Sequence, residues 1–176
     1  MAEEHTGVLA SIHRRPWPSL FGLLVVLSTV LLLILGSKIG FFLDDWDLVV
    51  DRSTASDWLL PHNEHIIVIP AAIYQFSLSA FGMDAFPLHL IAVGLFEASV
   101  VLMFFWLRTL IGEALAVLAC AVVLFLGAAT ADLVWAFQMG YFGSVAGGFG
   151  ALLMLRRESL RGDLWVDEEP LSPLEL

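Results

Sequence analysis

The segment from Leu20 to Ile39 constrains this chain most, because it is apolar over about 20 residues and carries one charge, on Lys38. A helix of that length is needed to cross the hydrocarbon core of a bilayer. The segment is longer than the core of a typical signal peptide, and no clear cleavage pattern of small residues follows it. We therefore predict a membrane-spanning helix that is retained in the protein.

The overall composition indicates the same class of protein. Hydrophobic residues make up 59% of the 176 residues and charged residues 15%, which is more apolar than a soluble domain of this size can bury. Three further segments have the character of spans: 87–107, 114–134 and 141–155. We predict an all-α, polytopic transmembrane helix bundle with four spans. The net charge of −10 and the lack of a basic stripe argue against a nucleic-acid partner.

The segment 64–80 is also apolar, but a proline and several polar residues interrupt it. Cytoplasmic loops of membrane proteins collect Lys and Arg. With four spans and a cytoplasmic N-terminus, Lys38 and Arg52 are the two of eight basic residues that lie outside. A fifth span over 64–80 would move Arg108 and the basic cluster after residue 155 to the outer face. We therefore predict that 64–80 is an interfacial helix within an extracytoplasmic loop, 40–86.

The same topology assigns the two ends of the chain. Residues 1–19 form a cytoplasmic N-terminus. Residues 156–176 are acidic and contain two prolines, and we predict a disordered cytoplasmic tail there. The four-span module itself covers residues 20–155.

Two adjacent acids, Asp44 and Asp45, follow the first span in the sequence FFLDDWD. Their carboxylates are expected at the membrane surface, at the height of the lipid phosphates. There they could hold a divalent cation, orient a hydroxyl group, or act as a general base. The alternative is that they are solvated loop acids that keep the loop outside. The residues alone leave both interpretations open.

A second polar cluster, PHNEH, contains His62, Glu64 and His65. If Asn63 caps the interfacial helix, this cluster lies at the positive helix end, where a phosphate is favoured. The alternative is a polar cap with no ligand. Two histidines and one carboxylate form only part of a metal-ligand set, and their spacing differs from that of a zinc helix. The metal question therefore stays open.

Glu97 lies near the middle of the second predicted span, with no basic residue within a helical turn. A carboxyl group inside a membrane is costly, so it usually faces a polar cavity or a partner. Glu97 is therefore either a functional site or a protonated group that bonds to a neighbouring helix and holds the bundle together.

Between the third and fourth spans, the sequence WAFQMGYFGS carries Trp135, Gln138 and Tyr141 at the outer surface. Trp and Tyr at this depth are typical of an aromatic belt. They could also line the mouth of a lipid or sugar site. The small residues of 143–150 favour close helix packing.

The combination of FFLDDWD, PHNEH and WAFQMGYFGS resembles the N-terminal part of GT-C-type glycosyltransferases, and a related group of bacterial membrane proteins. Enzymes of that type take sugars from polyprenyl-phosphate donors. The resemblance implies a bacterial plasma-membrane protein with both termini in the cytoplasm. It also implies glycosyl transfer to an acceptor hydroxyl on the extracytoplasmic face, with a polyprenyl-phosphate-linked sugar and the lipid bilayer as partners.

Within this resemblance, Asp44 or Asp45 serves as the catalytic base or orients the acceptor, and Asp44 is preferred because it comes first. The substrate-binding residues are His62, Glu64, His65, Trp135, Gln138 and Tyr141. The histidines and Glu64 touch a phosphate or a metal. No cofactor is established by the residues, and a divalent cation is the one candidate.

The resemblance departs from the family pattern in the number of spans, which is eight or more in such enzymes and four here. The chain is then a fragment, or a short relative that works with a partner membrane subunit. Two other functions remain open. One is a small transport or ion-binding protein that uses Glu97, and the other is a structural subunit that packs through 143–150.

Overall fold

The computed structural model describes residues 16–52, 54, 56–62 and 64–166. Most of these residues are helical, and the strands among them are two pairs of residues, β1 (Pro61–His62) and β2 (His65–Ile66). The predicted all-α class is therefore confirmed for this part of the chain.

Two helices, α2 (Pro16–Gly36) and α5 (Phe86–Ile111), are long and apolar enough to cross a membrane. They cover the first two predicted spans. Each has a proline in its first turn, where the missing N–H has no helical partner to lose. The helix α5 ends before Gly112, whose φ of +81° suits a residue without a Cβ atom.

The third predicted span, 114–134, is not a continuous helix. It consists of α6 (Glu113–Leu124), the single turn η2 (Gly127–Ala129) and α7 (Thr130–Val134). Gly127 weakens the helix at the break, and the hydroxyl of Thr130 closes a separate turn onto the Gly127 carbonyl. At about 1.5 Å per residue, α6 alone is shorter than the roughly 30 Å of a bilayer core.

The last helix, α8 (Met139–Val166), has 28 residues and extends well beyond the predicted span 141–155. The predicted disorder from residue 156 is therefore wrong for 156–166, which continue the helix. Arginine, glutamate and leucine in this stretch favour helix. The Arg156 guanidinium also donates a hydrogen bond to the Thr109 hydroxyl on α5. Residues 167–176 of the predicted tail lie outside the described residues.

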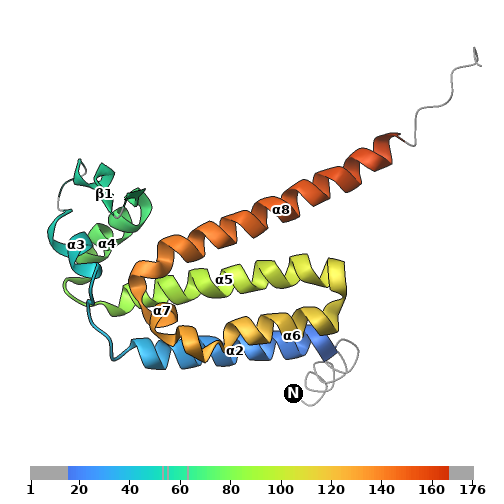
Figure 1. Ribbon diagram of the computed structural model, residues 1–176, viewed down its shortest axis with the longest axis horizontal. Coiled ribbons are helices and arrows are strands. Elements are labelled where there is room, and N and C mark those ends of the chain that lie inside the picture. The colour runs from blue at the N-terminus through green and yellow to red at the C-terminus, as the bar shows by residue number, and fades with distance from the viewer. Residues whose placement is uncertain (1–15, 53, 55, 63, 167–176) are drawn as a thin grey trace, which may run out of the picture.

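The helices α2, α5, α6 and α8 run in alternating directions and form the body of the molecule, with α8 diverging from the others along its length (Figure 1). The Phe21 and Phe104 rings stack at 4.1 Å between α2 and α5. The Ser28 hydroxyl donates to the Leu124 carbonyl at 3.3 Å and so joins α2 to α6. The core of the body is apolar and includes the buried Cys120.

A small lobe lies at the end of the body where α2 ends and α5 begins (Figure 1). It contains α3 (Asp45–Val50), η1 (Asp57–Leu59), the hairpin β1–β2, and α4 (Val68–Phe81). The interfacial helix predicted over 64–80 therefore begins four residues later than expected. Glu64 has a φ of +67° in the hairpin turn, which is incompatible with a helix start there.

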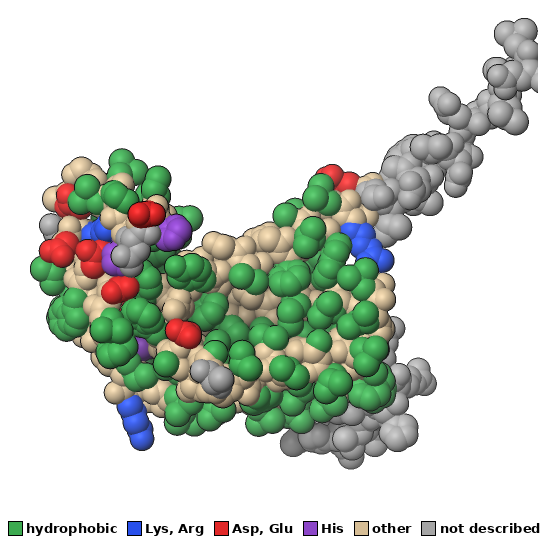
Figure 2. Space-filling model, in the orientation of Figure 1, with side chains coloured by type: hydrophobic (Ala, Val, Ile, Leu, Met, Phe, Trp, Pro, Cys, Tyr) green, Lys and Arg blue, Asp and Glu red, His purple; other side chains and the backbone are tan. Residues whose placement is uncertain are grey.

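The surface of the body is strongly apolar. Large side chains face outward along α2 and α6, with Val26 on α2 59% exposed, and the others include Leu23, Leu27, Ile34, Leu115, Leu118 and Val122. Figure 2 shows acidic and histidine side chains gathered over the lobe, and basic side chains at the far end of the molecule next to an acidic patch. The two ends of the bundle therefore differ in charge.

Candidate functional site

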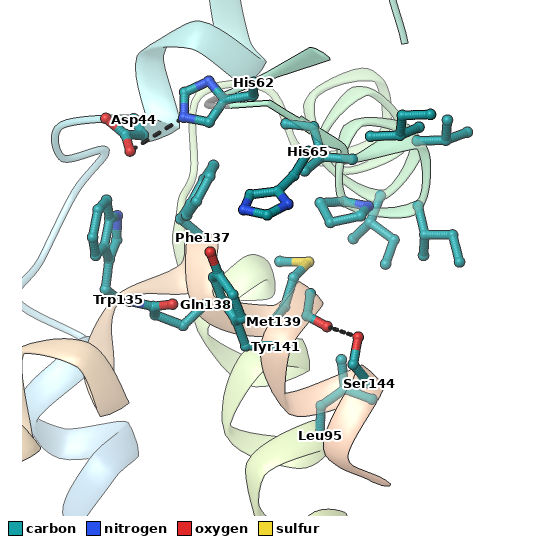
Figure 3. Close-up of a pocket in the computed structure, with 18 residues that line it drawn as sticks. Asp44, His62, His65, Leu95, Trp135, Phe137, Gln138, Met139, Tyr141 and Ser144 are labelled. Carbon is teal, nitrogen blue, oxygen red and sulfur yellow. Dashed lines mark hydrogen bonds and ion pairs between the residues drawn. The ribbon is translucent and has the colours of Figure 1, made fainter. Parts of the chain in front are cut away.

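A pocket of about 850 Å³ lies between the lobe and the start of α8. Its polar wall comes from the lobe and from the segment before α8, and its apolar wall comes from 66–70 and 73 with Leu95 and Met139. The polar residues that line it are Asp44, His62, His65, Gln138, Tyr141 and Ser144. Figure 3 shows these side chains around one space, and they come from the residue before α3, the hairpin, the turn before α8 and α8 itself.

The two adjacent acids have different environments. Asp44 lines the pocket, whereas Asp45 is only 1% exposed and lies inside the lobe. Asp45 is the first residue of α3, and successive side chains in a helix point about 100° apart. Consequently one carboxylate of the pair faces the pocket and the other faces the protein.

Asp45 is held by donors from two parts of the chain. The Phe42 amide donates to its Oδ2 at 2.8 Å, and the Tyr74 hydroxyl donates to its Oδ1. Burial raises the pKa of Asp45 above 3.8, while the hydrogen bonds from Tyr74 and Phe42 act in the opposite direction. Asp45 therefore anchors the loop to α4 and does not face the pocket.

His62 lies between two carboxylates. Its Nδ1 is 3.0 Å from Asp47 Oδ2, and its Nε2 is 3.3 Å from Asp44 Oδ2. The imidazole ring packs against the ring of Phe137 at 5.2 Å. Figure 3 shows His62 above Phe137 with its contact to Asp44 drawn. The hairpin therefore delivers His62 to the acid that lines the pocket.

Arg52 organises the loop behind this histidine and was not singled out from the sequence. It is buried, and its Nε and Nη2 donate to Asp47 Oδ2 at 3.2 and 3.1 Å. The same guanidinium donates to the main-chain carbonyls of residues 57, 60 and 61. Its position as a single arginine within an acidic loop could have drawn attention to it. A sequence does not show, however, which main-chain carbonyls a side chain contacts.

His65 and Glu64 do not cap a helix as the sequence suggested. His65 pairs with His62 across the antiparallel hairpin, and its side chain reaches the pocket. Glu64 is exposed in the turn and does not line the pocket. Asn63, the proposed cap, lies outside the described residues, and α4 begins at Val68 without a side-chain cap.

Trp135, Gln138 and Tyr141 also line the pocket. The Trp135 indole N–H donates to the Phe42 carbonyl at 3.2 Å, and its ring stacks on Phe137 at 5.4 Å. Gln138 Nε2 donates to Asp132 Oδ1 at 3.2 Å. Segments more than 90 residues apart therefore meet in one site.

Within the part of the chain that the structure describes, no group of three or more His, Cys, Asp or Glu side chains is arranged to hold a metal ion. Both nitrogens of His62 already face carboxylates. The divalent cation considered from the sequence therefore has no geometric support among these residues.

Glu97 does not line the pocket. Its side chain is buried between helices, 7% exposed, and neither carboxyl oxygen has a hydrogen-bond partner among the described residues. The hydroxyls of Ser28 and Thr29 on α2 lie beside it, but each donates to a main-chain carbonyl. His89, on the same helix, is also buried, with its Nε2 2.9 Å from the Ile39 carbonyl.

No family model matches this chain, and no curated protein or solved structure is significantly similar to it. The resemblance to GT-C enzymes therefore depends on the short motifs quoted above. In the structure, all three motifs contribute side chains to one pocket.

Proposed function

We propose that this protein is an integral membrane protein that crosses the bilayer four times, with both termini in the cytoplasm. The exposed apolar side chains of α2 and α6 support a lipid environment, because water-soluble proteins rarely expose such continuous apolar surfaces. The charge difference between the two ends supports the orientation, with the arginine-rich end inside. The broken segment 113–134 makes the third crossing.

The pocket, in this proposal, binds a lipid-phosphate-linked sugar. Its apolar wall suits a prenyl chain that enters from the membrane, and its polar wall suits the phosphate and sugar. The single observation that carries the proposal is the convergence of Asp44, His65 and Tyr141 on one space of about 850 Å³ beside that apolar wall. Ligand sites commonly combine an apolar lining with a few placed polar groups.

The proposed reaction is transfer of the sugar to an acceptor hydroxyl. The bond between the sugar's anomeric carbon and the phosphate oxygen breaks, and a bond from that carbon to the acceptor oxygen forms. The acceptor proton moves to the Asp44 carboxylate, and the lipid phosphate leaves. Asp44 is assigned as the base because it lines the pocket, whereas Asp45 is buried in the loop.

The remaining polar side chains take supporting roles. His65 contacts the phosphate, and Gln138 and Tyr141 hydrogen-bond the sugar. Trp135 offers an aromatic face to the same space. Further membrane segments from a partner subunit complete the site, in keeping with the larger span number of GT-C enzymes.

The test measures transfer from radiolabelled polyprenyl-phosphate hexoses and pentoses in native membranes, where any partner subunit is retained. Asp44→Asn is expected to abolish transfer while the protein accumulates normally. Asp51→Asn is the matched control, because Asp51 is an exposed acid of the same loop that does not line the pocket. Full transfer by Asp44→Asn would overturn the proposal.

The unpartnered carboxyl of Glu97 favours a second candidate function, proton or cation binding within the membrane. It predicts a pH-dependent ion flux in liposomes that Glu97→Gln removes. The single buried carboxyl, with only hydroxyls beside it, makes a poor conduction path. A flux that Glu97→Gln leaves unchanged would exclude this function.

A further inference from the structure

Three side chains, Asp44, His62 and Asp47, form a continuous array that ends at the pocket. The two ring nitrogens of His62 each face a carboxylate oxygen, at 3.3 Å for Asp44 and 3.0 Å for Asp47. A hydrogen bond needs one proton between its two heavy atoms, and a carboxylate brings none. The array therefore requires a proton in each of two contacts, whereas a neutral imidazole supplies only one.

Arg52 decides which contact the neutral imidazole fills. Its Nε and Nη2 both donate to Asp47 Oδ2, the oxygen that also faces His62 Nδ1. As the carboxylate partner of Arg52, Asp47 can only accept hydrogen bonds. The contact from Nδ1 to Asp47 is also the shorter of the two, so we assign the proton of a neutral His62 to Nδ1, and Nε2 is the nitrogen that faces Asp44.

We propose that His62 is a positioning residue that takes up, on Nε2, the proton which Asp44 removes from the acceptor hydroxyl. This inference rests on the proposed function of the pocket. The proton passes from the acceptor oxygen to an Asp44 oxygen, and from there to Nε2. Asp44 returns to a carboxylate, and His62 becomes an imidazolium that donates to both neighbours.

The direction of the second transfer follows from the intrinsic chemistry of the groups, since an imidazole binds a proton more tightly than a carboxylate does. Four charged or titratable groups lie around His62. Asp44 and Asp47 face it directly, Arg52 lies behind Asp47, and His65 is its partner across the hairpin. The Phe137 ring covers one side of the imidazole.

The pH dependence of transfer distinguishes proton storage by His62 from a purely structural role. If His62 stores the proton, transfer falls on the acid side as the imidazole becomes protonated before the reaction begins. His62→Gln keeps a hydrogen-bonding side chain but has no proton to store. We expect it to reduce transfer by about 100-fold at neutral pH, the lower end of the usual acid–base contribution, and to remove that acid limb.

The closing experiment combines these pH profiles with ¹⁵N NMR of histidine-labelled protein in nanodiscs, in which the His62 signal is identified by its loss in His62→Gln. The neutral wild-type ring is expected to carry its proton on Nδ1.

The outcomes separate the two levels of the proposal. Absence of transfer by the wild-type protein from every donor overturns the proposed function. Transfer with an unchanged acid limb in His62→Gln overturns only the role of His62. A neutral ring protonated on Nε2 overturns that role whatever the transfer result.

Discussion

The hydroxyl of Tyr74 on α4 donates a hydrogen bond to the carboxylate of Asp45 at the start of α3, 29 residues earlier in the chain. Both side chains are almost fully buried. A buried hydroxyl and a buried carboxyl that satisfy each other hold two separate elements at a fixed spacing. This contact therefore sets the position of Asp44, the preceding residue, at the edge of the pocket.

Tyr74→Phe is expected to lower the free energy of unfolding by about 2 kcal/mol, because it leaves a buried carboxyl short of one donor. Chemical unfolding followed by tryptophan fluorescence measures the change. Tyr141→Phe is the matched control, since the Tyr141 side chain is 58% exposed. Equal stability of both variants would show that the Tyr74 contact contributes nothing.

The raised pKa of Asp45 predicts a pH dependence of stability. Because burial raises that pKa in the folded protein above its ordinary 3.8, the folded state binds the proton more tightly than the unfolded state. The free energy of unfolding is therefore expected to increase as pH falls through the raised value, until it levels off near 3.8.

The difference between the wild-type and Asp45→Asn stability curves measures this term, because groups common to both proteins cancel. Asp57 acts in a separate range, since hydrogen bonds from Thr54 lower the pKa of that carboxyl below 3.8. The contribution of Asp57 to the free energy of unfolding is lost only in more acidic solution, below pH 3.8. A flat difference curve above pH 4 would contradict the prediction for Asp45.

Arg52→Lys is expected to destabilise the lobe by roughly 2 to 4 kcal/mol, although it preserves the charge. A lysine ammonium cannot reach Asp47 and three carbonyls together, so buried acceptors lose their donors. Hydrogen exchange measures the loss as faster exchange of amides over 57–62. Lys38→Arg, at an exposed cation, is the control, and it should leave exchange unchanged.

The proposed topology predicts opposite accessibility of the two ends of the molecule. In a Cys120→Ala background, Asp51→Cys should react with an impermeant maleimide in intact cells, and Glu158→Cys only after lysis. Both positions are exposed, so a difference in labelling reports the side of the membrane and not burial. Labelling of both in intact cells would rule out the orientation.

The long apolar runs made α2 and α5 predictable, because a stretch of about 20 apolar residues has few alternatives to a helix. The break within 113–134 was not predictable from hydropathy. The residues at the break are as apolar as those of a membrane-spanning helix. The helix is interrupted because Gly127 and Thr130 form a local turn. Likewise, the helix of 156–166 follows from local propensity and not from hydropathy.

Several residues that line the pocket stood out in the sequence, but their geometry did not. The motifs identified Asp44, His62 and Trp135, yet a sequence cannot distinguish the buried acid of an adjacent pair from the one that lines a pocket. The helix-cap interpretation of Glu64 failed because its left-handed backbone conformation forms a hairpin turn instead. Arg52 was missed because most of its partners are carbonyl groups that every residue carries.

The hydrogen bond from Trp135 to the Phe42 carbonyl bears on how the protein is made. The ribosome synthesises the N-terminal loop long before residues 135–144, which line the pocket from the other side. Nascent protein therefore carries the acidic lobe without its pocket. The pocket between the lobe and α8 therefore forms only after the start of α8 has been synthesised.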